Sequence, residues 1–222
     1  MIVIVDYAMG NIGSIANMYR RLGIKATIAQ SPNAIAEADR LILPGVGAFD
    51  QGMGNLERLG LRTAIDRRVQ DEGIPVLGIC LGMQLMTRSS EEGRRAGLGW
   101  IPADTVHFRK GAEVEARAMR FPHIGWEFVD IVKAHPMVDS LLTDPRFYFV
   151  HTYRVVCDHQ TDVLLKSAYG DIEFTAAFAR ANVAGVQFHP EKSHKFGMQL
   201  LASFARWQPR LEPAGKEGCV RA

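Results

Sequence analysis

The sequence predicts an α/β fold with an open mixed sheet that is mostly parallel, helices on both faces and added antiparallel strands. In the first half of the chain, short apolar runs alternate with amphipathic stretches, which is typical of strand–helix–strand units and a parallel sheet. In the second half, strand-like runs follow one another directly, which indicates hairpins. The composition, 47% hydrophobic and 23% charged over 222 residues, is that of a globular chain able to bury one substantial core.

Each element of the first half follows from a local pattern. Ile2–Val5 is a β-branched run that ends at Asp6, as in a buried strand. Apolar residues then recur at steps of three and four from Ile12 to Leu22, which predicts one face of a helix. We expect further strands at Lys25–Ala29, Arg40–Leu43 and Pro75–Cys80, and further helices across the fifties and sixties and over Leu81–Thr87.

The second half is expected to be rich in strands. These are Thr105–Phe108, Glu127–Ile131, Phe147–Val156, Val163–Ser167, Glu173–Ala179 and Ala184–Phe188, with a helix over Ser193–Trp207. Because no composition shift or internal repeat divides the chain, we expect one domain over residues 1–208. Residues 209–222 contain Pro, Gly and mixed charges with little apolar content, and are expected to form a flexible C-terminal tail.

Charge and cysteine usage narrow the class of protein. The formal net charge is +2 without a long basic run, which argues against nucleic acid or an acidic membrane as a partner. The first apolar run ends at Asp6, too early for a secretory signal or a membrane span. Cys80, Cys157 and Cys219 form no CxxC pair, so we expect a cytoplasmic protein without disulfides, metal or cofactor.

The first motif with chemical meaning is Gly78-Ile79-Cys80-Leu81-Gly82, at the junction of a predicted strand and a predicted helix. It has the form of a nucleophile elbow with cysteine in place of serine. Flanking glycines permit a tight turn, and the helix N-terminus favours a thiolate. The alternative is an ordinary core cysteine at a strand end, and the pentapeptide alone leaves both interpretations open.

The second motif is His189-Pro190-Glu191. A thiolate nucleophile needs an imidazole as base and acid, and the imidazole needs a third group that fixes its tautomer. On an extended segment, residues two apart project to one side, and proline favours that conformation. Alone, the motif is equally a surface histidine beside an acid. Together with Cys80, it supplies the two missing members of a triad.

The third motif is the glycine-rich turn Leu43–Phe49, which follows a predicted strand. Such a turn offers backbone N–H groups to an anion. It is neither a Walker loop nor a dinucleotide-binding fingerprint, because the required spacing of glycines and lysine is absent. By itself it is an ordinary turn at a strand end.

The three motifs together, PGVG at 44–47, GICLGMQ at 78–84 and GVQFHPEKS at 185–193, closely resemble the class I (triad-type) glutamine amidotransferases. Segments similar to the glutaminase subunit of imidazole glycerol phosphate synthase are DYAMGN at 6–11, LPGVGAF at 43–49, GLGWI at 97–101, PHIGW at 122–126 and YFVHTY at 148–153. The resemblance extends from Met1 to about Trp207 and implies that family's flavodoxin-like fold.

The resemblance also implies an activity, the hydrolysis of L-glutamine to glutamate and ammonia. Cys80 is then the nucleophile that forms a γ-glutamyl thioester, His189 the base and acid, and Glu191 the residue that orients the imidazole. The implied oxyanion hole consists of backbone amides at Val46, Gly47 and Leu81, and the implied glutamine-binding residues are Gly45, Gln84, His151, Thr152 and Tyr153.

The resemblance implies a protein partner as well. The glutaminase is expected to dock on a (β/α)8-barrel cyclase subunit of histidine biosynthesis, which receives ammonia through a tunnel. Trp126, Tyr148 and Lys192 fall in segments assigned to the docking face, although a packed aromatic pair and a solvated lysine explain them equally well. Cys157 and Cys219 have no role in this scheme.

The chain departs from the family pattern at Ala8, where glycine is usual, and at Glu127, where asparagine is common. The segment His194–Gly197 resembles a paralogous branch that supplies ammonia to a sugar amidotransferase synthetase in surface-polysaccharide synthesis. That paralog is the alternative function. Two other classes remain at this stage, a thiol peptidase and an inactive regulatory subunit. Gln84 and the intact set of Cys80, His189 and Glu191 argue against both.

Overall fold

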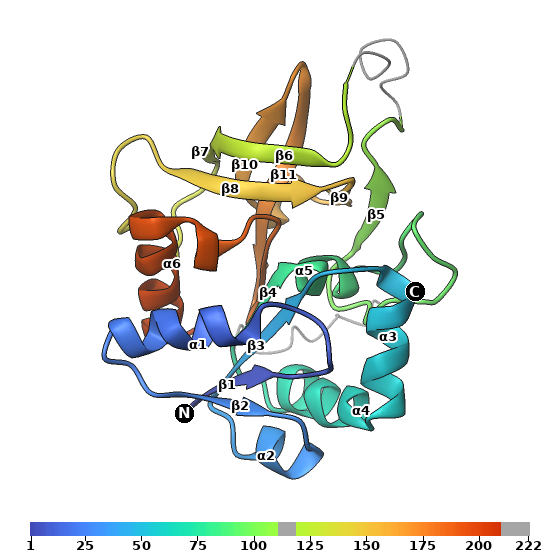
Figure 1. Ribbon diagram of the computed structural model, residues 1–222, viewed down its shortest axis with the longest axis vertical. Coiled ribbons are helices and arrows are strands. Elements are labelled where there is room, and N and C mark those ends of the chain that lie inside the picture. Colours follow the sequence, from blue (N-terminus) through green and yellow to red (C-terminus); the bar gives the residue numbers. More distant parts are fainter. Residues whose placement is uncertain (111–118, 210–222) are drawn as a thin grey trace, which may run out of the picture.

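The computed structural model describes residues 1–110 and 119–209, and Figure 1 shows their arrangement. Within these residues, a ten-stranded mixed sheet has the order β2-β1-β3-β4-β12-β11-β10-β7, with β5 and β9 attached beside β11, and β6 and β8 form a separate pair. The predicted tail lies outside the described residues, apart from Pro209.

The bounds of the elements are as follows. The strands are β1 (Ile2–Val5), β2 (Ala26–Ala29), β3 (Arg40–Gly45), β4 (Val76–Cys80), β5 (Ala103–His107), β6 (His123–Phe128), β7 (Asp130–Ile131), β8 (Arg146–His151), β9 (Tyr153–Cys157), β10 (Val163–Tyr169), β11 (Ile172–Arg180) and β12 (Val183–Val186). The helices are α1 (Ile12–Arg21), α2 (Pro32–Ala36), α3 (Phe49–Arg58), α4 (Leu61–Asp66), α5 (Leu81–Leu85) and α6 (His194–Arg206), with the helical turns η1 (Arg67–Asp71), η3 (Gln160–Asp162) and η4 (Pro190–Lys192).

The centre of the sheet is parallel and joins distant parts of the chain. Strand β4 pairs in parallel with β3 on one side and with β12 on the other. In the β4–β12 pair, Ile79 lies opposite Val186. Both strands are fully buried, as expected for apolar runs covered on both faces. The segment after β12 therefore leaves the sheet at the same edge as Cys80, the last residue of β4.

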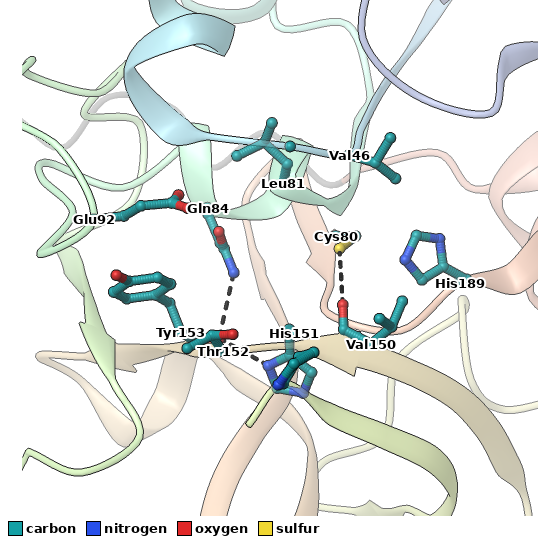
Figure 2. Close-up of a pocket in the computed structure, with 12 residues that line it drawn as sticks. Val46, Cys80, Leu81, Gln84, Glu92, Val150, His151, Thr152, Tyr153 and His189 are labelled. Atoms are coloured by element: carbon teal, nitrogen blue, oxygen red, sulfur yellow. Dashed lines mark hydrogen bonds between the residues drawn. The ribbon is translucent and has the colours of Figure 1, made fainter. Parts of the chain in front are cut away.

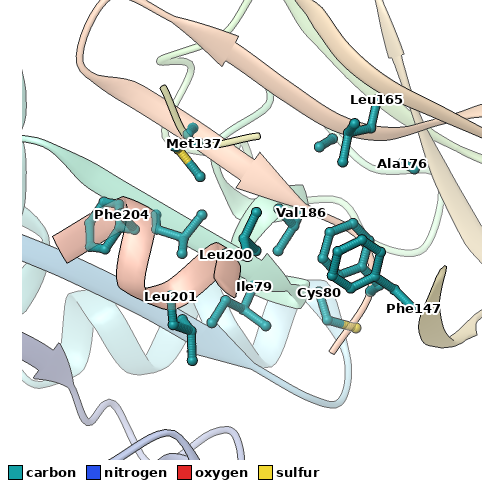
Figure 3. Close-up of a cluster of buried hydrophobic side chains, with 14 of the residues drawn as sticks. Ile79, Cys80, Met137, Phe147, Leu165, Ala176, Val186, Leu200, Leu201 and Phe204 are labelled. Carbon is teal, nitrogen blue, oxygen red and sulfur yellow. The ribbon is translucent and has the colours of Figure 1, made fainter. Parts of the chain in front are cut away.

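Helices cover both faces of the sheet, as the sequence predicts. Alternate residues of β1 point to opposite faces. Ile4 packs in one hydrophobic cluster with α1 and α6, whereas Val5 packs in a second cluster with α2, α3 and α4. Figure 3 shows the first cluster, in which Leu200 and Phe204 of α6 lie against the sheet beside Ile79.

Three expectations drawn from the sequence are wrong in detail. The predicted strand Phe147–Val156 is two strands, since β8 pairs with β6 whereas β9, beyond Thr152, pairs with β5 and β11. The strand predicted over Glu127–Ile131 is likewise divided between β6 and β7. The single helix expected in the fifties and sixties is divided at Gly60, where φ is +67°, and continues from α4 into η1. In the two strand cases the apolar pattern continues through a change of partner strand.

Two further features of the described residues complete the fold. Helix α2, which the sequence analysis does not predict, begins at Ser31, whose side chain accepts a hydrogen bond from the Ala34 amide as an N-cap. Over residues 1–110 and 119–209, every helix is too short or too polar to cross a membrane.

We expect Gly82→Ala to destabilise the fold strongly. A Cβ at Gly82 would overlap the backbone carbonyl of Leu43 in the neighbouring strand, and backbone yields less than a flexible side chain. The expected loss in unfolding free energy is at least about 3 kcal/mol, measured by urea denaturation.

The matched control is Gly13→Ala in α1, where nothing lies within 4 Å of the added Cβ. Because alanine has the higher helix propensity, this variant is expected to gain up to about 1 kcal/mol. Equal stability of the two variants would show that Gly82 is not held against β3.

Candidate active site

Cys80 occupies a sharp turn between β4 and α5. Its backbone has φ +54° and ψ −109°, a conformation that side chains with a Cβ rarely adopt. The glycines of the motif make this turn possible. A Cβ at Gly78 would stand 2.7 Å from the Met83 amide nitrogen, and one at Gly82 would overlap the carbonyl of Leu43. The structure thus places Cys80 on a strand-to-helix elbow.

A cavity of about 240 Å³ opens beside Cys80, as Figure 2 shows. It is lined by Val46, Gly47, Cys80, Leu81, Gln84, Glu92, Pro122, Val150, His151, Thr152, Tyr153 and His189. A volume below that of drug-sized sites suits a small ligand such as a free amino acid. The thiol is 7% exposed and lies on the wall of this cavity.

His189 reaches the same cavity from the segment that follows β12. Its Nδ1 lies 2.8 Å from Oε1 of Glu191, and both side chains are 2% exposed. A carboxylate only accepts, so Nδ1 carries the proton of this hydrogen bond. The other ring nitrogen, Nε2, is buried without a hydrogen-bond partner among the described residues, and the ring lies beside the Cys80 sulfur in Figure 2.

The environment of His189 favours its charged form. Burial alone lowers the pKa of His189, but the interactions with Cys80 and with the Glu191 carboxylate outweigh it and raise the pKa to about 10. The imidazolium therefore persists across the neutral range next to the sulfur. Such a cation stabilises a thiolate, the reactive form of cysteine.

The turn predicted to supply oxyanion donors lies beside the elbow, because Gly45, which precedes it, pairs with Cys80 between β3 and β4. Val46 and Gly47 line the cavity together with Leu81, which begins α5. Gly47 has φ +112°, a conformation that favours glycine. Gly45, assigned to glutamine binding, lies beneath the turn, where an added Cβ would overlap the Tyr7 hydroxyl rather than face the cavity.

The loop at 6–11 supports this turn from below. Tyr7 is fully buried, and burial followed by the charge of Cys80 raises the pKa of its hydroxyl. A Cβ at Gly10 would stand 3.3 Å from Cα of Gly45, so the two backbones are in close contact. Ala8, at the position where the sequence analysis expects glycine, adopts φ +62°. The unusual backbone of this loop thus holds the cavity turn in place.

The predicted glutamine-binding segments form the opposite wall. His151, Thr152 and Tyr153 line the cavity where β8 ends and β9 begins. The Gln84 Nε2 donates hydrogen bonds to the Tyr153 carbonyl at 3.3 Å and to Oε1 of Gln187 at 3.1 Å. Gln84 is therefore anchored by its amide nitrogen.

The structure adds cavity residues that the sequence analysis missed, namely Glu92, Pro122 and Val150. Glu92 accepts a hydrogen bond from the Phe49 amide at 2.9 Å, and burial raises the pKa of its carboxyl. It lies in a charged loop without a recognisable motif, so no local signal identifies it. Over residues 1–110 and 119–209, no group of three or more His, Cys, Asp or Glu side chains is arranged to hold a metal ion.

The three residues assigned to docking lie together on the surface. The rings of Trp126 and Tyr148 are 6.2 Å apart, and the Lys192 Nζ lies 5.4 Å above the Tyr148 ring. His194 stacks on Trp126 with ring planes 3° apart. These four residues, from β6, β8, η4 and the start of α6, are called the aromatic cluster below.

We expect His189→Gln to slow alkylation of Cys80 by iodoacetamide at pH 7 by about tenfold or more, because a thiol without a cationic neighbour is only a few per cent ionised there. The rate is measured residue by residue by mass spectrometry. Cys157 is the internal control, because burial raises its pKa to about 12 and keeps it unreactive in both proteins. An unchanged rate at Cys80 would show that His189 does not activate the thiol.

Comparisons with known proteins agree with this architecture. Residues 3–206 match the family model described as glutamine amidotransferase class-I. Imidazole glycerol phosphate synthase subunit HisH 2 of Methanococcus maripaludis is 48% identical over 206 residues, 93% of this chain and 99% of the relative. Subunit HisH of Bdellovibrio bacteriovorus is 46% identical over 205 residues, 92% of this chain and 99% of the relative.

Solved structures share the fold at low sequence identity. The structure of PurLQS from Thermotoga maritima superposes with a TM-score of 0.71 at 17% identity and covers 92% of this chain and 97% of that chain. A glutamine amidotransferase from Thermotoga maritima gives 0.59 at 17% identity and covers 92% of this chain and 82% of that chain. The predicted fold class is confirmed. The chain belongs to the class I glutamine amidotransferase family.

Proposed function

We propose that this chain is the glutaminase subunit of an imidazole glycerol phosphate synthase, and that Cys80, His189 and Glu191 are its catalytic residues. The observation that carries the proposal is the elbow cysteine beside the imidazole of His189, both on the wall of one small cavity. The full-length similarity to subunits of that synthase supplies the choice of enzyme within the family.

The geometry supports nucleophilic catalysis on an amide. In the proposed reaction, the Cys80 sulfur attacks the side-chain amide carbon of glutamine. Glu191 holds the Nδ1 proton of His189 and leaves Nε2 to exchange a proton with the sulfur and the leaving nitrogen. Ammonia departs and a γ-glutamyl thioester remains. Water then attacks the thioester, with His189 as the base, and releases glutamate.

In the proposed reaction, negative charge develops on the amide oxygen of glutamine near the N-terminus of α5. The backbone amide of Leu81 follows the nucleophile at a helix N-terminus, where N–H groups have no partner within the helix. A second donor is proposed from the Val46–Gly47 turn, which lines the cavity next to Leu81. Loss of one such donor typically raises the barrier by about 3 kcal/mol. The orientation of the peptide at Val46 is therefore a sensitive control point for this site.

The cavity walls away from Cys80 match the α-carbon end of a free amino acid. The Glu92 carboxylate lines the cavity and is placed to receive an α-ammonium group, and the segment Thr152–Tyr153 is placed to bind the same end of the ligand. A thiol peptidase would instead need an extended groove for flanking residues. An inactive regulatory subunit would have no reason to keep a buried imidazole–carboxylate pair beside an elbow thiol.

The partner proposed for this chain is a (β/α)8-barrel cyclase, which consumes the ammonia before it is protonated in water. The aromatic cluster is the proposed docking face. Its tryptophan is 41% exposed although it is large and apolar, and its lysine carries no ion pair among the described residues. Cys80 and Cys157 are free thiols, which is the state expected in the reducing cytoplasm, the proposed location of this chain.

The second candidate is the surface-polysaccharide paralog, which performs the same glutamine half-reaction for a different acceptor. The segment that favours it is His194–Gly197, and His194 belongs to the aromatic cluster. The acceptor protein that co-purifies with the chain distinguishes the two candidates. None of the proposed catalytic residues depends on this choice.

We expect Cys80→Ala to abolish release of glutamate from glutamine, measured with the purified cyclase and its nucleotide ligand. The nucleophile has no substitute, and removal of a single triad member typically costs about 10⁴-fold or more. Cys157→Ala is the matched control and keeps the wild-type rate, because Cys157 lies outside the cavity. Full activity of Cys80→Ala, or no glutaminase activity in the wild-type complex, would contradict the proposal.

We expect the double variant Trp126→Ala, Lys192→Ala to lose the stimulation of glutaminase activity by the partner, because the change removes two of the four side chains of the proposed docking face. The measurement is the ratio of the rates with and without the cyclase. Val156→Ala is the control, since Val156 is also 41% exposed but lies on β9. Unchanged stimulation of the double variant would exclude the aromatic cluster as the docking face.

A further inference from the structure

Two buried histidines lie side by side at the cavity, which His151 lines and His123 does not reach. His123 of β6 and His151 of β8 are directly opposite each other in the antiparallel pair. His123 is 0% exposed and His151 is 5% exposed. Their ring nitrogens, Nδ1 of His123 and Nε2 of His151, are 3.3 Å apart. His151 is assigned above to glutamine binding, whereas His123 has no assigned role.

The positions of the protons on the two imidazole rings follow from the group that His151 contacts. Nδ1 of His151 lies 2.8 Å from the carbonyl oxygen of Tyr153, which only accepts, so Nδ1 carries a proton. Burial, opposed only by this backbone hydrogen bond, lowers the pKa of His151 to about 3, so the ring is neutral and its Nε2 is an acceptor. His123 must therefore donate to it from Nδ1.

The outer end of the pair then lacks a donor. A neutral His123 that carries its proton on Nδ1 presents a lone pair at Nε2. The atom that faces it, Oε1 of Glu127 at 3.3 Å, belongs to a carboxylate, which also only accepts. The contact is a hydrogen bond only if one further proton lies between these two atoms. Burial lowers the pKa of His123, whereas Glu127 opposes that shift.

Other titratable groups do not supply this proton. Those that face His123 are Glu127 on its own strand, His151 on β8 and Tyr169 on β10. Tyr169 stacks on the His123 ring at 4.1 Å and donates its hydroxyl proton to the Arg120 carbonyl instead. The side chain of Glu127 is 35% exposed, so the extra proton exchanges with solvent there.

From His151, further hydrogen bonds connect the pair to the proposed nucleophile. The Tyr153 carbonyl that His151 contacts also accepts from Gln84 Nε2. Gln84 in turn donates to Gln187, whose Nε2 lies 3.8 Å from the Cys80 sulfur. A continuous line of hydrogen-bonded groups thus runs from the surface at Glu127, behind the cavity wall, to the thiol.

We propose that His123 and His151 are positioning residues of the glutamine site, and that a proton held between His123 and Glu127 keeps the Tyr153 carbonyl and Gln84 in place. This proposal rests on the glutaminase function above. At low pH the proton between His123 and Glu127 is present, and the cavity wall at Tyr153 and Gln84 is held in place. As the pH rises, His123 loses this proton, the contact with Glu127 is lost, and glutamine binds more weakly.

The test is glutamine affinity, measured by calorimetry on the full chain in a Cys80→Ser background, where hydrolysis does not interfere. Glu127→Gln provides an N–H donor that does not titrate, so we expect tight binding that is independent of pH. Glu127→Leu provides none, so we expect binding about tenfold weaker at every pH. Equal affinity of these two variants at every pH would overturn the proposal.

A second measurement needs no glutamine. Imidazole ¹⁵N spectra of the histidine-labelled chain report which ring nitrogen carries a proton, with His151→Gln used for assignment. We expect His151 to be protonated at Nδ1 and unprotonated at Nε2. The opposite tautomer would overturn the proposal. If the complex fails to hydrolyse glutamine, the proposed function fails, but these spectra still decide the protonation of the pair.

Discussion

The parallel pairing of β4 with β12 is the contact on which the site depends. It joins a strand from the first half of the chain to one near its end and sets both at the same edge of the sheet. Cys80 and His189 therefore meet only in the folded chain. The apolar layers on both faces of these strands stabilise the pairing, so burial of the core maintains the geometry of the proposed catalytic residues.

Strain and support are divided between neighbouring segments. The backbone of Cys80 is held in a conformation that costs about 1 to 3 kcal/mol, and the close contacts of Gly78 and Gly82 show how tightly the surroundings enforce it. Next to the elbow, the loop at 6–11 supports the turn at Val46 and Gly47. A rigid sheet thus presents reactive groups on short loops, which is a common way to build a site.

Local patterns predict much of this fold, because buried strands such as Ile2–Val5 and the elbow at Cys80 are determined by adjacent residues. What depends on distant pairing was not predictable. The break at Thr152 exists because β8 and β9 join different partners, and the His123–His151 contact depends on the register of β6 with β8. Glu92 reaches the cavity from a loop without periodicity, so only the structure places it there.

The proposed reaction depends on attack by the Cys80 sulfur on the side-chain amide carbon of glutamine. The most direct measurement is to trap that attack with a diazo-ketone analogue of glutamine and to locate the adduct by mass spectrometry. We expect a single adduct on Cys80, prevented by an excess of glutamine. If the chain, after treatment with the analogue, were inactivated by an adduct on a residue other than Cys80, or hydrolysed glutamine with Cys80 blocked, this attack would be contradicted.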